Sequence, residues 1–545
     1  MASSDRENPQ AASDTHRATR GRRFASNARG RVLRAATSPL GISSMLVLAL
    51  IAVAVVLNVT DDAGNISPSP SGGEVGEATE PDVPAAGEVA PAGPQPTSDR
   101  LPTEESGDDL ARGRATEPPV TPEPERDSVA TSCPERCLIR VPATDGIDTT
   151  LNAAGTRASW MNASWAWTVA TPDTITALEK QAETTLVSQS AETLRLYVVI
   201  MPDGQQDDSV IEGFGTIIDA VDQVRLVEVE SVPAIVTPLI DSGYAVEKIL
   251  PAPPEETVKS EPSTALADID IGTLGDDVSN ENLERTILDL QATSSTDGSG
   301  AGTRYYSATG NAMAAEYLVQ RMERYGLRVW YEDFLMPDGH LLVNVVGEVA
   351  GRDPSTIYGV LSHYDTLSTD LADSPGADDN ATGIAAALEI ARILSAYELK
   401  HPVRLIFVSA EEVGIIGSDQ FARRAVAEEI PYKGIFNVDA VGSDRQGPLL
   451  VLNTEGTGVA MQELMAEINE GYRLGQDLLV RQNPAIVADD NKLRDQGLPA
   501  VLVSRELYGW STIHHTPDDL IDYVSIPNTG SATTLVLLSL ATLVQ

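Results

Sequence analysis

The sequence predicts an α/β fold in which a mostly parallel sheet carries helices on both faces. Strand-like apolar runs alternate with helical patterns from about residue 268 to residue 545. Polar residues that can bind metals or move protons directly follow three of these strands. The composition, 42% hydrophobic and 22% charged, is that of a globular protein and excludes wholesale disorder.

The elements of this α/β region, residues 265–545, follow from hydrophobic periodicity. Strands are expected at residues 342–349, 357–361, 403–408, 435–438 and 500–503. Helices are expected at residues 283–290, 312–325, 383–394, 418–427 and 459–468. The last apolar segment, residues 532–544, is too short to cross a bilayer and is expected to be a core helix.

The amino-terminal part predicts a membrane anchor. Residues 1–39 form a basic tail, and residues 40–59 are apolar and uncharged, long enough for the roughly 20 residues that a bilayer requires. The arginines of the tail should remain in the cytoplasm, so we expect a single-pass signal-anchor in the cell membrane with the folded part outside the cytoplasm. A cleaved signal peptide is the alternative, although no Ala-x-Ala site follows the apolar run.

Two further segments precede the α/β region. Residues 60–130 are acidic and rich in proline, which predicts a disordered stalk. Residues 131–254 predict a small α+β domain of unknown role, with strands near 196–201, 224–229 and 244–250 and a helix near 234–242. Its only cysteines, Cys133 and Cys137, are expected to form a local disulfide outside the cytoplasm, with two free thiols as the alternative.

The charge balance and the cysteine count exclude several classes of protein. The chain has 38 basic and 80 acidic side chains, a net charge of −42, which argues against a nucleic-acid partner. Two cysteines are too few for an iron–sulfur protein or a cysteine-based zinc protein. Any metal site must therefore be built from carboxylates and the six histidines.

Such residues gather after the predicted strands. His363 and Asp365 follow one strand, Glu411 and Glu412 follow another, and Asp439 follows a third. In an open parallel sheet these carboxyl ends meet at one edge, where ligands bind. Further candidates lie before a helix, at Asp378 and Asp379, and late in the chain, at His514 and His515. Imidazoles together with several carboxylates suit zinc and exceed what one ion needs, so a two-metal site is expected.

The region of residues 275–545 resembles metallopeptidase family twenty-eight, the di-zinc aminopeptidases, whose relatives include glutamate carboxypeptidases and glutaminyl cyclases. The resemblance implies a zinc exopeptidase-like fold. It is carried by motifs in the family's order: Gly302-Thr-Arg304-Tyr-Tyr-Ser, Gly310-Asn311, Asn344-Val-Val, His363-Tyr-Asp365, Gly376-Ala-Asp-Asp379-Asn-Ala-Thr-Gly383, Glu411-Glu412-Val-Gly, Gly417-Ser418, Asn437-Val-Asp439, Gly497-Leu-Pro499 and His515-Thr-Pro-Asp-Asp519.

The resemblance implies two Zn²⁺ ions per chain and a ligand set. His363 and Asp439 would bind one zinc, Glu412 and His515 the other, and Asp379 would bridge both. Asp379 rather than its neighbour Asp378 is assigned because the family's bridging aspartate directly precedes asparagine and lies four residues before a glycine. His515 rather than His514 is assigned because the family's ligand histidine lies four residues before an aspartate.

The same resemblance assigns the catalytic roles. Glu411 would be the general base, taking a proton from a water that bridges the metals and passing it to the leaving amine. Asp365 would orient the His363 imidazole. Two positions depart from the family: His514 replaces a tyrosine that can stabilise an oxyanion, and Asp490 replaces a histidine near the substrate pocket.

The sequence therefore predicts a membrane-anchored, extracytoplasmic di-zinc exopeptidase, an aminopeptidase acting on the amino terminus of a peptide or protein. A carboxypeptidase or another amidohydrolase on the same fold is the first alternative. A glutaminyl cyclase fits less well, because that branch typically manages with one zinc. A catalytically silent surface interaction protein is the alternative from another class, and the complete ligand set together with Glu411 argues against it.

Overall fold

The computed structural model describes residues 128–254, 262, 264–293, 302–443, 449–505 and 513–545. The predicted basic tail, the membrane span at 40–59 and nearly all of the stalk lie outside these residues. Among the helices that the structure describes, none has the length and apolarity that a membrane span requires.

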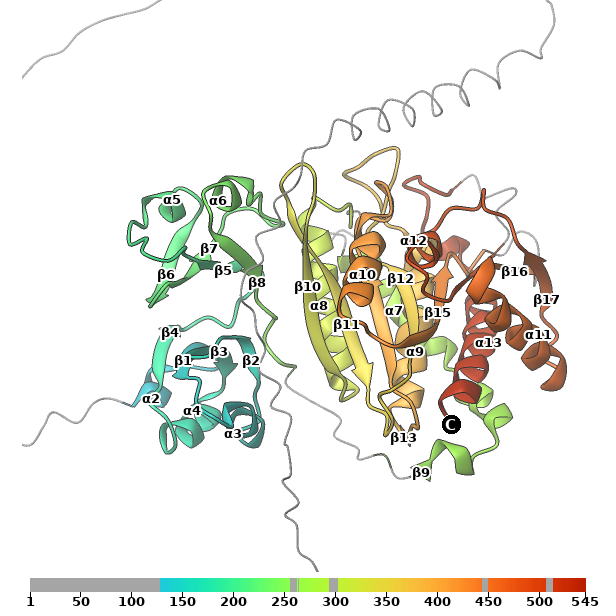
Figure 1. Ribbon diagram of the computed structural model, residues 1–545, viewed down its shortest axis with the longest axis horizontal. Coiled ribbons are helices and arrows are strands. Elements are labelled where there is room, and N and C mark those ends of the chain that lie inside the picture. The colour runs from blue at the N-terminus through green and yellow to red at the C-terminus, as the bar shows by residue number, and fades with distance from the viewer. Residues whose placement is uncertain (1–127, 255–261, 263, 294–301, 444–448, 506–512) are drawn as a thin grey trace, which may run out of the picture. The chain divides into compact units, whose positions relative to one another are not determined.

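An eight-stranded sheet forms the centre of the carboxy-terminal region (Figure 1), in the order β10-β11-β14-β12-β15-β18-β16-β17. Its strands are β10 (Arg328–Leu335), β11 (Leu341–Val349), β12 (Ile357–His363), β14 (Val403–Val408), β15 (Tyr432–Asp439), β16 (Leu449–Asn453), β17 (Asp477–Arg481) and β18 (Ala500–Arg505). The four central strands β14, β12, β15 and β18 are parallel. Antiparallel pairs join β10 to β11, β11 to β14 and β16 to β18. β16 and β17 also pair in parallel. The expected α/β architecture is confirmed, and the sheet is mixed, with parallel pairs in the majority.

Helices cover both faces of this sheet, as expected. The larger apolar core joins one face to α7 (Asn280–Thr293), α8 (Thr309–Arg324), α9 (Gly383–Leu394), α11 (Val459–Gly471) and α13 (Ile526–Val544). The smaller core joins the other face to α10 (Ile416–Ala427) and α12 (Asp489–Asp495). Helix α13, whose apolar residues are largely buried, is the predicted core helix. A short pair, β9 (Thr264–Ala265) with β13 (Tyr397–Glu398), lies outside the main sheet.

The region before residue 254 contains two sheets with the same topology. After α2 (Val129–Ser132), the first module comprises β1 (Cys137–Pro142), α3 (Ile147–Ala153), β2 (Ala158–Met161), β3 (Trp165–Ala170), α4 (Pro172–Glu179) and β4 (Thr185–Ser188). The second comprises β5 (Leu196–Ile200), α5 (Ser209–Glu212), β6 (Thr216–Val221), β7 (Val224–Glu228), α6 (Thr237–Asp241) and β8 (Ala245–Lys248). Their orders, β2-β3-β1-β4 and β6-β7-β5-β8, are equivalent and antiparallel. The predicted single small domain is therefore a tandem pair of β-α-β-β-α-β modules, the ferredoxin-like arrangement.

Tryptophans join the two modules. Trp160 donates its indole N–H to Glu247 at 2.6 Å, and Trp167 donates to Asp219 at 2.8 Å. Trp167 is fully buried in an apolar cluster that contains residues of both modules. These contacts satisfy the indole donors while burying the rings, so the two sheets share one core.

The second module packs against the carboxy-terminal region, and the described residues belong to one compact unit. The backbone N–H of Val236 donates to Gly339 O at 2.8 Å, and that of Leu341 donates to Ala234 O at 2.9 Å. The backbone N–H of Lys248 donates to the carboxylate of Asp333 on β10 at 3.2 Å. The module is thus attached to the β10–β11 hairpin by backbone hydrogen bonds as well as apolar contacts.

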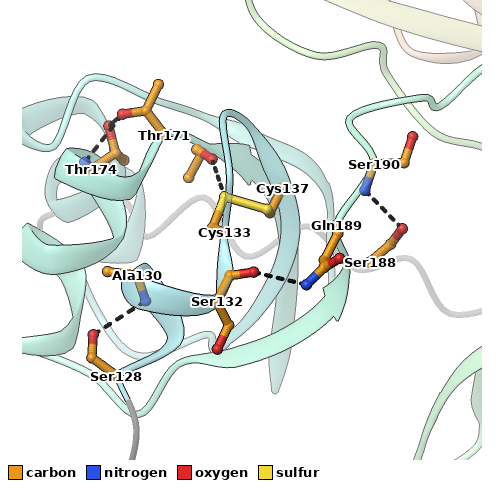
Figure 2. Close-up of a disulfide and its surroundings, with 11 residues drawn as sticks. Ser128, Ala130, Ser132, Cys133, Cys137, Thr171, Thr174, Ser188, Gln189 and Ser190 are labelled. Carbon is orange, nitrogen blue, oxygen red and sulfur yellow. Dashed lines mark hydrogen bonds between the residues drawn. A yellow bond between two sulfur atoms is a disulfide. The ribbon is translucent and has the colours of Figure 1, made fainter.

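Cys133 and Cys137 form a disulfide at the start of the first module (Figure 2), with their Cα atoms 5.8 Å apart. Both residues are buried in the core of that module. Gln189 donates to the backbone oxygen of Ser132 at 2.9 Å and so links the disulfide segment to the end of β4. The structure thus contains the disulfide that the sequence favoured over two free thiols.

Candidate metal centre

The carboxyl ends of three adjacent parallel strands form the base of the site. His363 is the last residue of β12 and pairs with Val408 at the end of β14, while Asp439 is the last residue of β15. Glu411 and Glu412 follow directly after β14. The parallel register therefore brings residues distant in sequence to one edge of the sheet, the edge at which ligands bind in open α/β sheets.

Two loops complete the site, and the bridging position falls on Asp379. Its Oδ1 lies 3.2 Å from His363 Nε2, and its Oδ2 lies 3.2 Å from His515 Nε2. On one side of Asp379, His363 Nε2 is also 3.4 Å from Asp439 Oδ1. On the other side, His515 Nε2 is 2.9 Å from Glu412 Oε2. The structure brings together all five predicted metal ligands.

These distances fit two zinc ions. Zinc bonds of about 2.0–2.2 Å in tetrahedral geometry separate neighbouring donor atoms by about 3.3–3.6 Å. The donor pairs around each side of Asp379 are close to this separation. Glu412 Oε1 and Asp439 Oδ1 are buried and have no hydrogen-bond partner among the described residues. Buried carboxylate oxygens that accept no hydrogen bond, at ligand spacing, indicate a cation site, because burying a charge without hydrogen bonds is costly.

The pKa shifts of the carboxylates also indicate that the site lacks positive charge. Burial and the neighbouring Asp379 carboxylate together raise the pKa of Glu412 to about 7. Burial also raises the pKa of Glu411 well above its usual range, with Asp489 and Glu412 adding to the effect and His363 opposing it. Burial likewise opposes ionisation of Asp379, but hydrogen bonds from three histidines hold its pKa well below the usual range. A divalent cation would relieve the repulsion among these carboxylates.

Asp365 contacts both His363 and the loop that carries the two glutamates. Its backbone oxygen lies 3.2 Å from His363 Nδ1, whereas its carboxylate is 3.7 Å from that nitrogen. The carboxylate accepts the backbone N–H groups of Glu411 at 3.1 Å and Glu412 at 3.2 Å. Asp365 therefore fixes the loop that carries the two glutamates, and its main chain contacts the histidine.

Two motif residues that had no assigned role also hold the Asp379 loop. The side chain of Asn380 donates to Val438 O at 3.0 Å and accepts from the backbone N–H of Gly383 at 2.9 Å. The fully buried guanidinium of Arg304 donates to the backbone oxygens of Pro375 and Gly376. The sequence pointed to Asn380 and Arg304 only through their place in the motifs. Their hydrogen-bond partners are backbone atoms, which the spacing of residues in a sequence does not reveal.

Strained backbone accompanies the ligands. Ala410, before the glutamates, has a φ of 60°, Ala440, after Asp439, has 47°, and His515 has 54°. Positive φ is unfavourable for residues with a Cβ and is concentrated at functional sites, where the surrounding structure enforces it. At Gly383 a Cβ would lie 2.2 Å from Val438 O, so only glycine allows α9 to approach β15 this closely.

The other candidate residues, Asp378, His514 and Asp490, make different contacts in and around the site. Asp378 accepts the backbone N–H of Gly442 at 2.8 Å, a structural contact away from the bridging position. His514 lies within the site, with Nδ1 3.1 Å from Asp379 Oδ2. Asp490, which stands where the family has histidine, is fully buried and pairs with Arg494 at 3.0 Å. This position is therefore occupied by an ion pair internal to α12.

Comparison with known proteins agrees with the geometry. Residues 344–540 match the model of peptidase family M28. A probable zinc metalloprotease of Pyrenophora tritici-repentis is 29% identical over 225 residues, covering 37% of this chain and 42% of the relative. An aminopeptidase of Bacillus subtilis is 27% identical over 183 residues, covering 32% of this chain and 38% of the relative. The chain thus spans about two fifths of the length of these curated relatives.

Among solved structures, an aminopeptidase from Aneurinibacillus sp. strain AM-1 aligns with 51% of this chain and 96% of its own, at 17% identity and a TM-score of 0.44. LapB from Legionella pneumophila aligns with 75% of this chain and 99% of its own, at 17% identity and a TM-score of 0.45. The match of residues 344–540 to the model of peptidase family M28 confirms the resemblance seen in the sequence.

Proposed function

We propose that the protein is a di-zinc aminopeptidase. The observation that carries the proposal is the placement of Asp379, whose two carboxylate oxygens face separate donor pairs at ligand spacing. His363 and Asp439 would hold one ion, and Glu412 and His515 the other. When bound, the two zinc ions would lower the pKa of a water held between them and polarise the scissile carbonyl.

Glu411 supplies the proton chemistry of the proposed reaction. It adjoins the ligand Glu412, and its own position is fixed by the hydrogen bond from its backbone N–H to Asp365. Burial raises its affinity for a proton, as a group that must take one from the attacking water requires. In this scheme Glu411 then delivers the proton to the leaving amine.

The charges around the site favour a substrate with a free amino terminus over one with a free carboxylate. Glu411 and Asp489 add acidic groups beyond the five ligands. The described arginines near the site are engaged elsewhere: Arg304 and Arg505 donate to backbone oxygens, and Arg494 pairs with Asp490. Carboxypeptidase recognition would need a cation directed at the substrate carboxylate.

The proposal is tested with purified protein and two substrate classes. Zinc content near two per chain, together with chelator-sensitive hydrolysis of amino-acid anilides, is the expected result. N-acetylated anilides should resist cleavage, because they lack the amino group. Preferential cleavage of N-acylated peptides from their carboxyl end would establish the carboxypeptidase alternative. Absence of bound zinc and of hydrolysis would leave the silent interaction protein.

We also propose that residues 40–59 anchor the protein in the cell membrane with residues 60–545 outside the cytoplasm. The proposal rests on the apolar, uncharged segment and the basic tail before it. The disulfide between Cys133 and Cys137 supports an oxidising compartment. Expressed full-length protein should remain in the membrane fraction after alkaline carbonate extraction and be digested by protease added outside the cell; release by carbonate would refute the anchor.

A further inference from the structure

The chain turn that carries the two glutamates has an unfavourable backbone conformation at both ends. Ala410, directly before Glu411, has a φ of 60°, and Ile415 has a φ of 58°. A positive φ is uncommon for any residue with a Cβ and is an outlier for a β-branched residue such as isoleucine. It persists only where the surrounding structure enforces it. The carboxylate of Asp365 holds the middle of this turn, so the ends depend on other contacts.

The β10–β11 hairpin supplies packing for one end of the turn. Strand β11 is antiparallel to β14, with Val345 opposite Phe407, so the beginning of β11 lies at the sheet edge that carries the glutamates. The fully buried Ala410 shares an apolar cluster with three hairpin residues, and three partly buried side chains pack against it: Phe334, Met336 and Leu342, then Tyr306, Val413 and Ile416. The hairpin therefore covers the strained residue that precedes Glu411.

The hairpin turn is itself bonded to the second module. Residues 234–236 pair with it in antiparallel fashion: the backbone N–H of Val236 donates to Gly339 O at 2.8 Å, and that of Leu341 donates to Ala234 O at 2.9 Å. Leu341 is buried in the apolar cluster of the module. The module, the hairpin and the glutamate turn thus form one continuous series of contacts.

Tyr306 contacts both the hairpin turn and the glutamate turn. Its hydroxyl donates to Asp338 Oδ2 at 2.7 Å, and its ring stands edge-on to His340 with centroids 5.9 Å apart. The same ring packs against the cluster that contains Ala410. Tyr306 therefore fixes the distance between two turns that are remote in the sequence.

We propose that the second module positions the turn of Glu411 and Glu412 through the β10–β11 hairpin, with Tyr306 as the positioning residue between them. The inference rests on the proposed roles of the two glutamates and gives residues 131–254 a function, that of a permanent part of the peptidase. Displacing the hairpin from the module removes packing that keeps Ala410 at positive φ. Glu411 then leaves the position from which it takes up a proton.

Gly339→Ala tests the contact between module and hairpin. Gly339 has a φ of 96°, and a Cβ there would collide with the side chain of Thr237 in the module. Gly204→Ala is the matched control, because Gly204 has a φ of 84° and its Cβ would meet nothing within 4 Å. At saturating zinc, Gly339→Ala should lower kcat for anilides by about 10–100-fold and leave KM unchanged, because it displaces the proton acceptor and not the substrate. Gly204→Ala should keep the wild-type kcat.

Amide hydrogen exchange measures the glutamate turn directly and does not depend on activity. Exchange at residues 411–416 should be faster in Gly339→Ala than in Gly204→Ala, whereas exchange at residues 378–383, a loop held by other contacts, should be equal in both. Tyr306→Ala is the second variant and should give the same result. Tyr306→Phe keeps the ring against Ala410 and should retain most of the activity.

Three results would overturn the inference without touching the proposed function. The first is unchanged exchange at residues 411–416 in both Gly339→Ala and Tyr306→Ala. The second is higher activity in Gly339→Ala, which a module that acts as an inhibitor predicts. The third is an equal loss in Tyr306→Phe and Tyr306→Ala with a raised KM, which would make Tyr306 a substrate contact. A wild type without zinc-dependent hydrolysis would overturn the proposed function instead, and the exchange rates would still decide whether the module holds the turn.

Discussion

The carboxylate of Asp519 holds the backbone of Asp379. Its Oδ2 accepts the Asp379 N–H at 3.1 Å, and its Oδ1 accepts the N–H of the preceding residue, Asp378, at 2.9 Å. Asp519 belongs to the loop that carries His515, so one loop supplies a metal ligand and also fixes the bridging carboxylate. Asp365 does the same for Glu411 and Glu412. In both cases a buried aspartate that is not itself a proposed ligand accepts the backbone N–H groups of a proposed ligand and of the residue before it.

Replacing Asp519 should therefore weaken metal binding without removing a ligand. Asp519→Ala leaves two buried N–H groups without an acceptor and frees the Asp379 loop. We expect zinc affinity to fall by about 10–100-fold, the range typical of residues that support a ligand. Chelator competition measures the change, and the exposed neighbour Asp518→Ala is the matched control. Equal zinc affinity in both variants would contradict a supporting role for Asp519.

Replacing Glu411 should lower activity without weakening zinc binding. Glu411→Gln preserves shape but cannot take up a proton, so kcat should fall by about 10²–10⁴-fold. Zinc content should remain near that of the wild type, because Glu411 is not in the ligand set. The neighbouring Glu412→Gln is the control, since it should lose affinity for one zinc. Metal analysis alongside anilide kinetics separates the two, and zinc loss in Glu411→Gln would make Glu411 a ligand instead.

Much of the site could be predicted from the sequence because its residues follow strongly apolar strands. His363 and Asp439 end strands β12 and β15, whose burial is nearly complete, so the runs were visible and their ends were well defined. The edges of the sheet were harder to predict. Strand β17 (Asp477–Arg481) is largely exposed along its length, so no apolar run marked it. Strand β10 interleaves buried and partly exposed positions, including Glu332 and Asp333.

The tandem modules could not be predicted for a related reason. Strand β6 (Thr216–Val221) has no fully buried residue, and β4 (Thr185–Ser188) is only four residues long and partly exposed. Their equivalence lies in strand order, which depends on hydrogen bonds between distant segments and leaves no periodic signal. The contacts of Asp365 with the backbone N–H groups of Glu411 and Glu412 could not be predicted either, because a sequence pattern does not reveal bonds to backbone atoms.

The disulfide should stabilise the first module by a modest amount. The two cysteines are four positions apart, and closing so short a loop removes about 2 kcal/mol of chain entropy from the unfolded state. The double variant Cys133→Ala/Cys137→Ala should lower the free energy of unfolding by about this amount. Urea unfolding measures it, and anilide hydrolysis should be unchanged, because the disulfide lies in a different module from the metal ligands. An unfolding free energy equal to the wild type would contradict the prediction.

The contact between the second module and β10 should make stability depend on pH. Burial raises the pKa of Asp333 to about 7, so between about pH 4 and 7 the folded state holds a proton that the unfolded state has released. The free energy of unfolding should therefore fall as pH rises through this window, by at most about 1.4 kcal/mol per pH unit. Burial lowers the pKa of Lys248 to about 8, so its own contribution rises with pH between about 8 and 10.

Asp333→Asn isolates the acidic part of this dependence. The asparagine oxygen can still accept the backbone N–H of Lys248, but it carries no titrating proton. The variant should therefore gain stability relative to the wild type as pH rises from 5 to 7, a range bounded by the normal and raised values of Asp333. Asp370→Asn, at an exposed position, is the control and should track the wild type. Urea unfolding at each pH gives the comparison, and a constant difference between Asp333→Asn and wild type would show that Asp333 titrates as an ordinary surface carboxylate.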